Sequence, residues 1–305
     1  MMTDGEPLTV GIVNYRTRDR LRACLAALVD HDGPVLVVDN ASEDGSAEMV
    51  RAEFPSVTLD VSERNLGFGA AANRILAATT TRYLLLLNAD ARPTPGGLAA
   101  LVAKLDQRPD VAIVGPRLHT DEGDLQRSCR QFPSITSFFV DQSGLRPVID
   151  RLGIGDRHRR FDHDHDRVVP WVLGAVMAMR VEAVRGVGGF DDGFFLYFEE
   201  IDLSRRLARV GHRTLFTADA TFGHVGGASS ATRPVFATQA FYRSGARYFA
   251  IHGRPWARPL YRPVALVALA GNALATLVRR RRNEFAFLKA IVGDRHTWRV
   301  DTVDG

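Results

Sequence analysis

The sequence contains few cysteines and few lysines. Its two cysteines, Cys24 and Cys129, are widely separated among 305 residues and have no metal-ligand spacing. This disfavours a disulfide framework or a zinc cluster and fits a reducing cytosolic setting. The two lysines are Lys104 and Lys289, so arginine provides almost all of the positive charge. Because arginine usage can follow genome composition, the preference for arginine over lysine does not by itself identify a binding partner.

The sequence also lacks a secretory signal, an internal repeat, a low-complexity tract and a full-length apolar membrane span. The residues before Leu8 do not have the charged-then-apolar order of a signal peptide, so we expect a cytoplasmic protein. Residues 264–278 are nearly all apolar and precede Arg279–Arg282, but this run is shorter than the ~20 residues that span a bilayer. A transmembrane helix is therefore the less favoured interpretation. The run predicts instead either a helix on the inner face of the plasma membrane or a helix packed on the rest of the fold.

Short apolar runs alternate with helical stretches in the first part of the chain, and 46% of the whole sequence is hydrophobic. The predicted strands are residues 8–13, 35–38, 57–61, 83–87 and 111–114. The predicted helices between them are residues 18–29, 44–53, 68–78 and 94–105. Apolar strands that alternate with helices predict an α/β fold with a Rossmann-like, mostly parallel sheet flanked by helices on both faces.

Polar or acidic residues follow three of these strands, at positions 14–15, 39–40 and 88–90. In such sheets, ligands bind outside the carboxyl ends of the strands. Asp39 could accept the imide N–H of a uracil or thymine base, or serve only as a turn former. Asp90 follows a buried strand and suits a hard divalent cation, which prefers oxygen ligands. The segment RNLGFG before Asn73 could bring a diphosphate to a helix N-terminus, although many helices begin in this way.

Residues 117–168 have no regular pattern. His163 and His165 lie among acidic residues and could bind a metal, but a mobile loop is the favoured interpretation. Order returns with predicted strands at residues 169–179 and 213–217 and an acidic helix start at Glu199. Arginine and apolar residues dominate after residue 226. We therefore expect two parts, with the sheet and site in 1–225 and a basic C-terminal helical extension in 226–305.

Four segments in a fixed order, VGIVNY, VVDNASEDGS, RNLGFGAAAN and LLLNADA, resemble glycosyltransferase family 2, especially its bacterial rhamnosyltransferase-like members. The resemblance continues through WVLGA, GGFD and FEEIDL and covers roughly residues 8–252. It implies the GT-A fold, a nucleotide-sugar donor and a divalent cation, Mn²⁺ or Mg²⁺. The implied metal ligands are Asp90 and His224. The nucleotide-sugar-binding residues that we assign are Val13, Tyr15, Asp39, Asn65, Gly67, Asn73, Asn88, Ala89 and Gly174.

Two positions depart from the family pattern. Asn88 stands where the stricter pattern has an aspartate, so we expect weaker metal binding rather than none. The acidic run is usually Glu-Asp-x-Asp, and the match makes Glu200 the catalytic base, with Glu199 and Asp202 beside it. An acidic first turn that complements the helix dipole is the structural alternative. Arg205 and Arg243 could steady diphosphate charge, or simply pair at the surface.

The resemblance implies a metal-dependent, inverting glycosyltransferase without a covalent sugar intermediate. We expect dTDP-rhamnose as the donor, with UDP-linked sugars second, and a polyprenol-diphosphate-linked or other cell-envelope glycan as the acceptor. No nucleic-acid partner is expected. One alternative is a nucleotidyltransferase that makes a nucleotide sugar, although residues 14–17 supply no glycine-rich phosphate loop. The other is a non-catalytic nucleotide-sugar-binding protein, suggested by the departures at Asn88 and Glu200.

Overall fold

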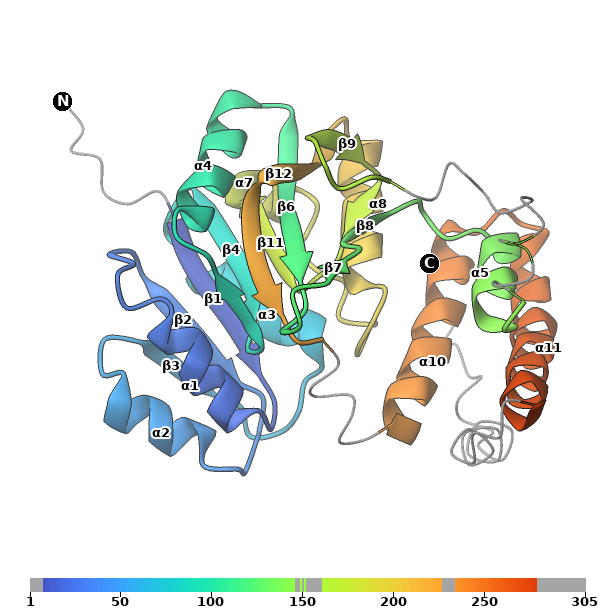
Figure 1. Cartoon of the computed structure of the whole chain (residues 1–305), viewed down its shortest axis with the longest axis horizontal. Helices are drawn as coiled ribbons and strands as arrows, with labels where there is room; N and C mark the ends of the chain where they lie inside the picture. Colours follow the sequence, from blue (N-terminus) through green and yellow to red (C-terminus); the bar gives the residue numbers. More distant parts are fainter. Residues whose placement is uncertain (1–7, 146–148, 150, 152–160, 227–233, 279–305) are drawn as a thin grey trace. The chain divides into compact units, whose positions relative to one another are not determined.

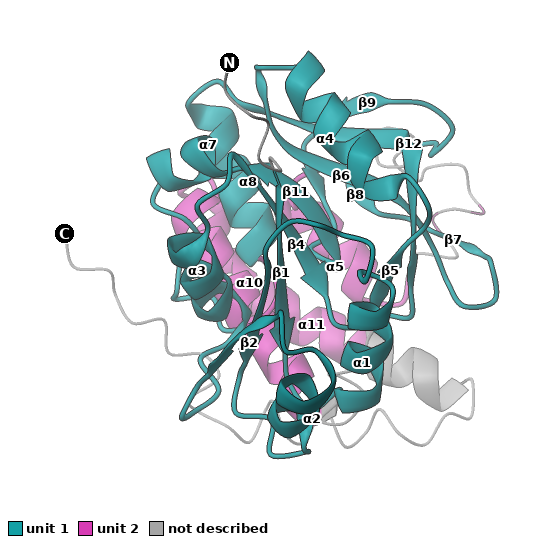
Figure 2. Ribbon diagram, turned by 90° about the vertical axis from the view of Figure 1, so that its left-hand side faces the viewer, with its two compact units in different colours: residues 1–131, 161–195, 199–231 teal, residues 132–160, 196–198, 232–305 magenta. Residues whose placement is uncertain are grey.

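The structure, a computed structural model, describes residues 8–145, 149, 151, 161–226 and 234–278 (Figure 1). The chain forms two compact units (Figure 2). The first unit consists of residues 1–131, 161–195 and 199–231, and the second of residues 132–160, 196–198 and 232–305. Residues 132–160 belong to the same unit as the C-terminal helices. The division predicted from the sequence had placed them in the first part, residues 1–225.

The first unit is built on a ten-stranded sheet whose main path runs β3–β2–β1–β4–β11–β6–β12–β5. The bounds along this path are β1 Leu8–Asn14, β2 Val35–Asp39, β3 Thr58–Val61, β4 Tyr83–Asn88, β5 Ala91–Pro93, β6 Val111–His119, β11 Val176–Arg180 and β12 Arg213–His224. Strands β7 (Leu125–Gln126) and β9 (Arg167–Val169) pair with β6 and β12, while β8 (Cys129–Arg130) and β10 (Trp171–Val172) form a second sheet. Strands β3, β2, β1 and β4 are parallel, and β11 is antiparallel to both of its neighbours.

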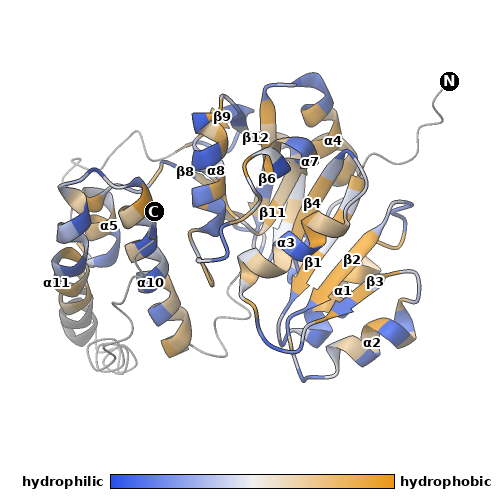
Figure 3. Cartoon of the chain, turned by 180° about the vertical axis from the view of Figure 1, so that it is seen from behind, coloured by the Kyte–Doolittle hydropathy of each residue, from blue (hydrophilic) through white to orange (hydrophobic). Residues whose placement is uncertain are grey.

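Helices cover both faces of this sheet. They are α1 Arg18–Ala26, α2 Ser46–Glu53, α3 Phe68–Ala78, α4 Gly97–Gln107, α7 Val181–Gly186 and α8 Glu199–Arg209. In β4, Leu85 and Leu87 join a core that includes residues of α1, α2 and α4, whereas Leu84 and Leu86 join a core that includes residues of α3, α7 and α8. Successive strand side chains point to opposite faces, so a strand buried on both faces is apolar throughout (Figure 3). The predicted α/β fold with a mostly parallel, helix-covered sheet is confirmed.

Several predicted boundaries were wrong. Strand β6 continues to His119 and β12 to His224, well beyond the predicted ends, because the two strands pair in parallel with each other. The predicted strand 169–179 is interrupted at residues 173–175, since β10 pairs with β8 and β11 pairs with β4. The stretch 117–168, predicted to be irregular, contains β7, β8 and the helix α5 (Ile135–Gln142).

The second unit contains α5, α10 (Pro234–His252) and α11 (Ala257–Val278) around an aromatic core. The Phe138 ring of α5 packs at centroid distances of 5.0–6.0 Å against Phe241, Tyr242, Phe249 and Tyr261. The predicted helix at residues 264–278 is the last part of α11, and Arg279–Arg282 lie outside the described residues. Within the described ranges, no helix combines the length and hydropathy that crossing a bilayer requires.

Candidate active site

Three neighbouring strands bring their carboxyl ends to the same edge of the sheet. Val13 of β1 lies in register with Val38 of β2 on one side and with Asn88 of β4 on the other. One residue further on, Asn14 lies opposite Asp39. The polar strand ends of the sequence are therefore neighbours at the edge where α/β sheets bind ligands.

Asp39, which the resemblance assigns to the nucleotide base, is 3% exposed and held by a hydrogen-bond network. Its Oδ1 accepts from Asn14 Nδ2 at 2.7 Å and from the Ser42 hydroxyl, while its Oδ2 accepts from the Ser42 backbone N–H at 3.2 Å. The fully buried Asn14 also accepts from the Thr17 hydroxyl at 2.7 Å. The sequence identified Asn14 only as a polar strand end, so its role in orienting Asp39 was missed.

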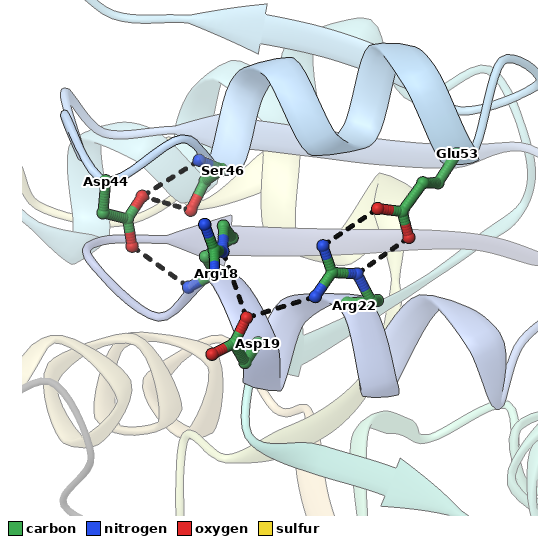
Figure 4. Close-up of polar contacts among 6 residues, drawn as sticks. All are labelled: Arg18, Asp19, Arg22, Asp44, Ser46 and Glu53. Carbon is green, nitrogen blue, oxygen red and sulfur yellow. Dashed lines mark hydrogen bonds and ion pairs between the residues drawn. The ribbon is translucent and has the colours of Figure 1, made fainter.

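The loop after Asp39 is anchored to the helices α1 and α2 (Figure 4). The Asp44 carboxylate accepts from the backbone N–H groups of Arg18 and Ser46 at 3.1 and 3.0 Å. Arg22 of α1 donates to both carboxylate oxygens of Glu53 on α2, at 2.7 and 2.9 Å. The Arg22–Glu53 pair is exposed and screened by water, so the buried contacts of Asp39 contribute more to the position of this loop.

Asn40 ties the predicted donor-binding segment before α3 to the end of β2. Its Nδ2 donates to Asn65 Oδ1 at 2.9 Å and to the Gly67 carbonyl at 3.1 Å, and its Oδ1 accepts from the Leu66 N–H at 2.8 Å. Gly67 has a φ of 84°, and a Cβ there would lie 2.5 Å from the Phe195 carbonyl oxygen. Only glycine fits this turn, so the backbone that precedes α3 is fixed in shape.

Asn73 and Asp202, assigned to the donor site and the catalytic group, both brace the loop before α8. Asn73 donates to the Phe190 carbonyl and accepts from the Phe190 N–H, each at 2.8 Å. Asp202 is 1% exposed and pairs with Arg206 at 2.7 Å, and Arg206 also donates to the Gly189 carbonyl at 2.7 Å. These contacts give both residues a structural role, and their contact with substrate stays a prediction.

The two predicted metal ligands lie side by side. His224 Nε2 is 3.3 Å from Asp90 Oδ1, and the residues are 4% and 9% exposed. His224 Nδ1 is 2.7 Å from Gln126 Oε1, so Gln126 orients the ring with Nε2 facing Asp90. Asn88 turns its amide nitrogen, rather than its carbonyl, to the same Nε2 at 3.4 Å. A protonated ring would donate from Nε2 to the Asp90 carboxylate, whereas a neutral ring with its proton on Nδ1 would leave Nε2 free to share a cation with Asp90.

This donor set fits a divalent cation. Burial opposes ionisation of Asp90, but the hydrogen bond and charge of His224 and the charge of Arg20 outweigh it, so the pKa of Asp90 lies below its ordinary value. The carboxylate is therefore charged at neutral pH. Where the chain is described, no three His, Cys, Asp or Glu side chains gather around one point. The protein would supply two ligands, and water or diphosphate oxygens would fill the remaining positions.

Glu200 lies in the first turn of α8 and is 8% exposed, and its Oε2 has no hydrogen-bond partner among the described residues. The neighbouring Glu199 is 5% exposed, and its Oε2 likewise lacks a partner there. A Cβ built on Gly174 would lie 3.7 Å from the Cβ and Cγ of Glu200. A small residue at position 174 therefore leaves space beside this carboxylate.

Strand β11 brings Glu200 and Asp90 to the same end of the sheet. The Asn88 N–H donates to the Ala175 carbonyl at 2.9 Å, so the segment that precedes β11 lies beside the end of β4. Gly174, the preceding residue, faces Glu200. Two residues beyond Asn88, the Asp90 carbonyl accepts from the Val225 N–H at 3.3 Å, next to His224.

The histidines of the central segment do not form a metal site. His163 is 2% exposed, its Nδ1 lies 3.1 Å from the Phe161 carbonyl, and its Nε2 accepts from the Ser128 N–H at 3.0 Å. Burial lowers the pKa of His163, which keeps the ring neutral. The interpretation as a mobile loop is thus corrected at His163, because both ring nitrogens have fixed partners. His165 is exposed and lies 3.1 Å from Asp162.

Comparison with known proteins identifies the family. Residues 9–171, more than half of the chain, match the family model described as glycosyl transferase family 2. The chain is a family 2 glycosyltransferase. The resemblance found in the sequence motifs is confirmed. Family 2 enzymes transfer a sugar from a nucleotide sugar, so the family favours this reaction over the two alternatives, a nucleotidyltransferase and a non-catalytic binding protein.

This glycosyltransferase is 28% identical over 280 residues to the N-acetylglucosaminyl-diphospho-decaprenol L-rhamnosyltransferase of Mycobacterium tuberculosis. The aligned region covers 85% of this chain and 89% of that protein. Its fold resembles the mannosyltransferase PcManGT from Pyrobaculum calidifontis in complex with GDP-Man and Mn²⁺, with a TM-score of 0.52, 19% identity and coverage of 94% and 85%. GalNAc-T7 with UDP, GalNAc and Mn²⁺ gives a TM-score of 0.53 at 16% identity, covering 71% of this chain and 42% of that chain. At these identities the two structures support the fold alone.

The adjacent glutamates of α8 in this glycosyltransferase titrate above the ordinary range. Burial raises the pKa of Glu200 to about 7, against the lowering effects of backbone N–H groups and of Arg130. Burial, and then the charge of Glu200, raise the pKa of Glu199 well above its ordinary value. Two buried neighbouring carboxylates rarely carry charge together, so the pair holds a proton to a higher pH than two exposed glutamates would.

We predict that Glu200→Gln makes the stability of this glycosyltransferase less dependent on pH. The pKa of Glu200 is raised from 4.5 to about 7 in the folded state. The contribution of Glu200 to the free energy of unfolding is therefore fully present below the unfolded-state pKa and is lost as the pH rises through about 7. The amide does not titrate, so the variant should gain on the order of 2–3 kcal/mol relative to the parent between about pH 5 and pH 8.

Urea unfolding of both proteins at these two pH values measures the difference. The exposed Glu182→Gln is the matched control and should follow the parent at both values. If Glu200→Gln also follows the parent, Glu200 does not have the raised pKa.

Proposed function

We propose that this glycosyltransferase moves rhamnose from dTDP-rhamnose, with inversion, to a polyprenol-diphosphate-linked or other cell-envelope glycan acceptor. One observation supports the catalytic role of Glu200. Its buried carboxylate lies at the same end of the sheet as Asp90, and its Oε2 lacks a hydrogen-bond partner among the described residues. The Mycobacterium tuberculosis relative is a rhamnosyltransferase whose name includes a diphospho-decaprenol, which supports the sugar and the acceptor class. UDP-linked sugars are the second donor class.

The nucleotide would bind at the ends of β1 and β2, against Val13, Tyr15 and Asp39. Among the described contacts, Asp39 Oδ2 accepts one hydrogen bond, from the Ser42 N–H, and a carboxylate oxygen can accept another. That second position suits the imide N–H of thymine or uracil. The ribose and diphosphate would follow toward Asn65, Gly67 and Asn73 near the start of α3 and toward Asn88 and Ala89 after β4.

Asp90 and His224 would hold the Mn²⁺ or Mg²⁺ ion, which neutralises charge on the departing nucleoside diphosphate. Gln126 fixes the ring of His224 so that Nε2 faces Asp90. The structures of PcManGT and of GalNAc-T7 contain Mn²⁺, which supports a divalent cation in this fold. Asn88 adds no charge to the site, so metal affinity would depend on the donor diphosphate more than in sites with two carboxylates.

Glu200 would act as the general base. A sugar hydroxyl attacks poorly until its proton is removed, and a base is most useful when its pKa lies near the working pH. The pKa of Glu200, raised by burial to about 7, meets this requirement. The proton passes to the carboxylate as the acceptor oxygen bonds to the anomeric carbon, and the bond to the nucleoside diphosphate breaks with its electron pair. Gly174 leaves space for the acceptor, and one displacement inverts the centre.

We predict that dTDP-rhamnose with Mn²⁺ or Mg²⁺ raises the melting temperature by several degrees at saturation, since a ligand that binds the folded form stabilises it. UDP-glucose should stabilise less. CDP-glucose is the control, because cytosine has no ring N–H for Asp39 to accept, and it should give little shift. Differential scanning fluorimetry measures these values. Equal shifts with dTDP-rhamnose and CDP-glucose would contradict the assignment of Asp39 to the base.

We predict that Glu200→Gln reduces transfer by about 10²–10⁴-fold, because the amide cannot take the acceptor proton. The donor-induced rise in melting temperature should stay unchanged, since donor binding does not use this carboxylate. Release of nucleoside diphosphate in the presence of a lipid-linked acceptor measures the reaction. The exposed Glu182→Gln should transfer at the parental rate, and near-normal turnover by Glu200→Gln would exclude it as the base.

We predict that Gln126→Ala weakens Mn²⁺ binding by about 10–100-fold, the usual effect of removing a residue that orients a metal-bound histidine. Gln126→Glu keeps an acceptor for the Nδ1 proton and should bind Mn²⁺ at least as well as the parent. Calorimetric titration with Mn²⁺ in the presence of dTDP compares the variants. Unchanged affinity in Gln126→Ala would contradict the assignment of Gln126 as the residue that orients His224 toward the ion.

A further inference from the structure

The chain has opposite net charge on the two sides of residue 220. Residues 1–219 contain 31 acidic and 26 basic residues, a net charge of −5, and residues 220–305 contain 4 acidic and 13 basic residues, a net charge of +9. Residues 220–283 contain ten arginines and no aspartate or glutamate. A segment with this charge attracts an anionic surface.

Helix α11 is apolar on its exposed side as well as on its packed side. Tyr261, Ala265 and Ala268 are buried within the second unit. Where the side chains of α11 are described, at residues 257–271, six exposed residues are apolar, namely Pro259, Leu260, Pro263, Leu266, Val267 and Ala270. Leu266 and Val267 remain 42% and 59% exposed. A helix that faces water usually carries polar residues on that side, so this face is suited to an apolar environment.

Arginines follow one border of that apolar face. Arg258 and Arg262 are exposed and four residues apart, so they lie on the same side of the helix. At about 100° per residue, their row lies between the packed side and the row of Leu266. Just before the helix, Arg254 is exposed and Trp256 is 53% exposed. Tryptophan favours the headgroup level of a membrane, and arginine reaches lipid phosphates while aliphatic residues enter the acyl boundary.

We propose that this docking face, made of Trp256, Leu266 and Val267 with Arg254 and Arg258 at its border, binds the surface of an anionic phospholipid membrane. The helix would lie in the plane of the interface. A second copy of the chain is a poorer occupant, because it would bring the same arginines together. A nucleic acid would satisfy the arginines but leave Leu266 and Val267 in water. The proposal does not rest on the donor, the acceptor or the catalytic residues.

Cosedimentation of the full chain with lipid vesicles tests the proposal. The chain should bind vesicles that contain about one third phosphatidylglycerol, bind phosphatidylcholine vesicles weakly, and lose affinity as salt screens the arginines. Leu266→Asp with Val267→Asp should weaken binding by about tenfold or more, because both side chains leave the apolar layer. Val29→Asp with Val210→Asp is the matched control, since these valines of the first unit are 79% and 62% exposed. It should bind like the parent.

A second pair of variants tests the charges. Arg254→Gln with Arg258→Gln should weaken binding to the anionic vesicles by about fivefold for each arginine, whereas the exposed pair Arg51→Gln with Arg209→Gln should have no effect. Melting temperatures equal to that of the parent establish that all variants fold. Transfer to a water-soluble acceptor should be unchanged in them, which separates a failure of the docking proposal from a failure of the proposed reaction.

Three results would overturn the docking proposal. The first is no binding of the parent to anionic vesicles, and the second is unchanged binding after Leu266→Asp with Val267→Asp. The third is a dimer in solution that this double variant dissociates, because a second copy would then cover the face. Arginine-dependent binding to single-stranded RNA without vesicle binding would assign the charge to nucleic acid and would also exclude the membrane.

Discussion

Strand β11 enters the sheet antiparallel between β4 and β6, with Val176 opposite Leu87 and Ala178 opposite Val114. An antiparallel strand places its amino end at the carboxyl end of its neighbour. The segment that leads into β11 therefore meets the segment that leaves β4, and the Ala175 carbonyl accepts from the Asn88 N–H. A parallel strand here would carry residues 173–175 to the opposite edge. The association of Glu200 with the Asp90 side of the sheet depends on this one reversal of direction.

The acids around the site fall into two physical classes. Asp39 and Asp202 are buried with direct partners, Asn14 and Arg206, so burial costs them little and their positions are fixed. Glu199 and Glu200 are as deeply buried, but each has an oxygen without a partner among the described residues. Burying an unpaired carboxylate is unfavourable, and the usual response is a raised pKa rather than a buried charge. A protein that needed only stability would not keep this pair, which favours a chemical role for it.

The sequence predicted the parts of the site that follow from short-range order. Asp39 and Asp90 each come after an apolar strand, and parallel strands bring such ends together without further information. Asn14 was missed because its role follows from the register that sets it opposite Asp39 and from the position of Ser42 in the next loop. The environment of His163 was also unpredictable, since its partner Ser128 lies 35 residues earlier, between β7 and β8. Long-range pairing decided both cases.

The sequence shows that α11 is apolar, but it does not show which side of the helix is exposed, because both sides are apolar. The core of the second unit resolves this, since Tyr261 packs on Phe138 and turns Leu266 and Val267 away from that core. A face of a few aliphatic side chains and arginines gives modest, reversible membrane affinity, comparable with a single lipid anchor rather than an inserted span. Weak attachment would be sufficient for the proposed reaction, in which a water-soluble donor meets an acceptor confined to the membrane. Confinement to the surface raises the local acceptor concentration, and release remains possible after each encounter.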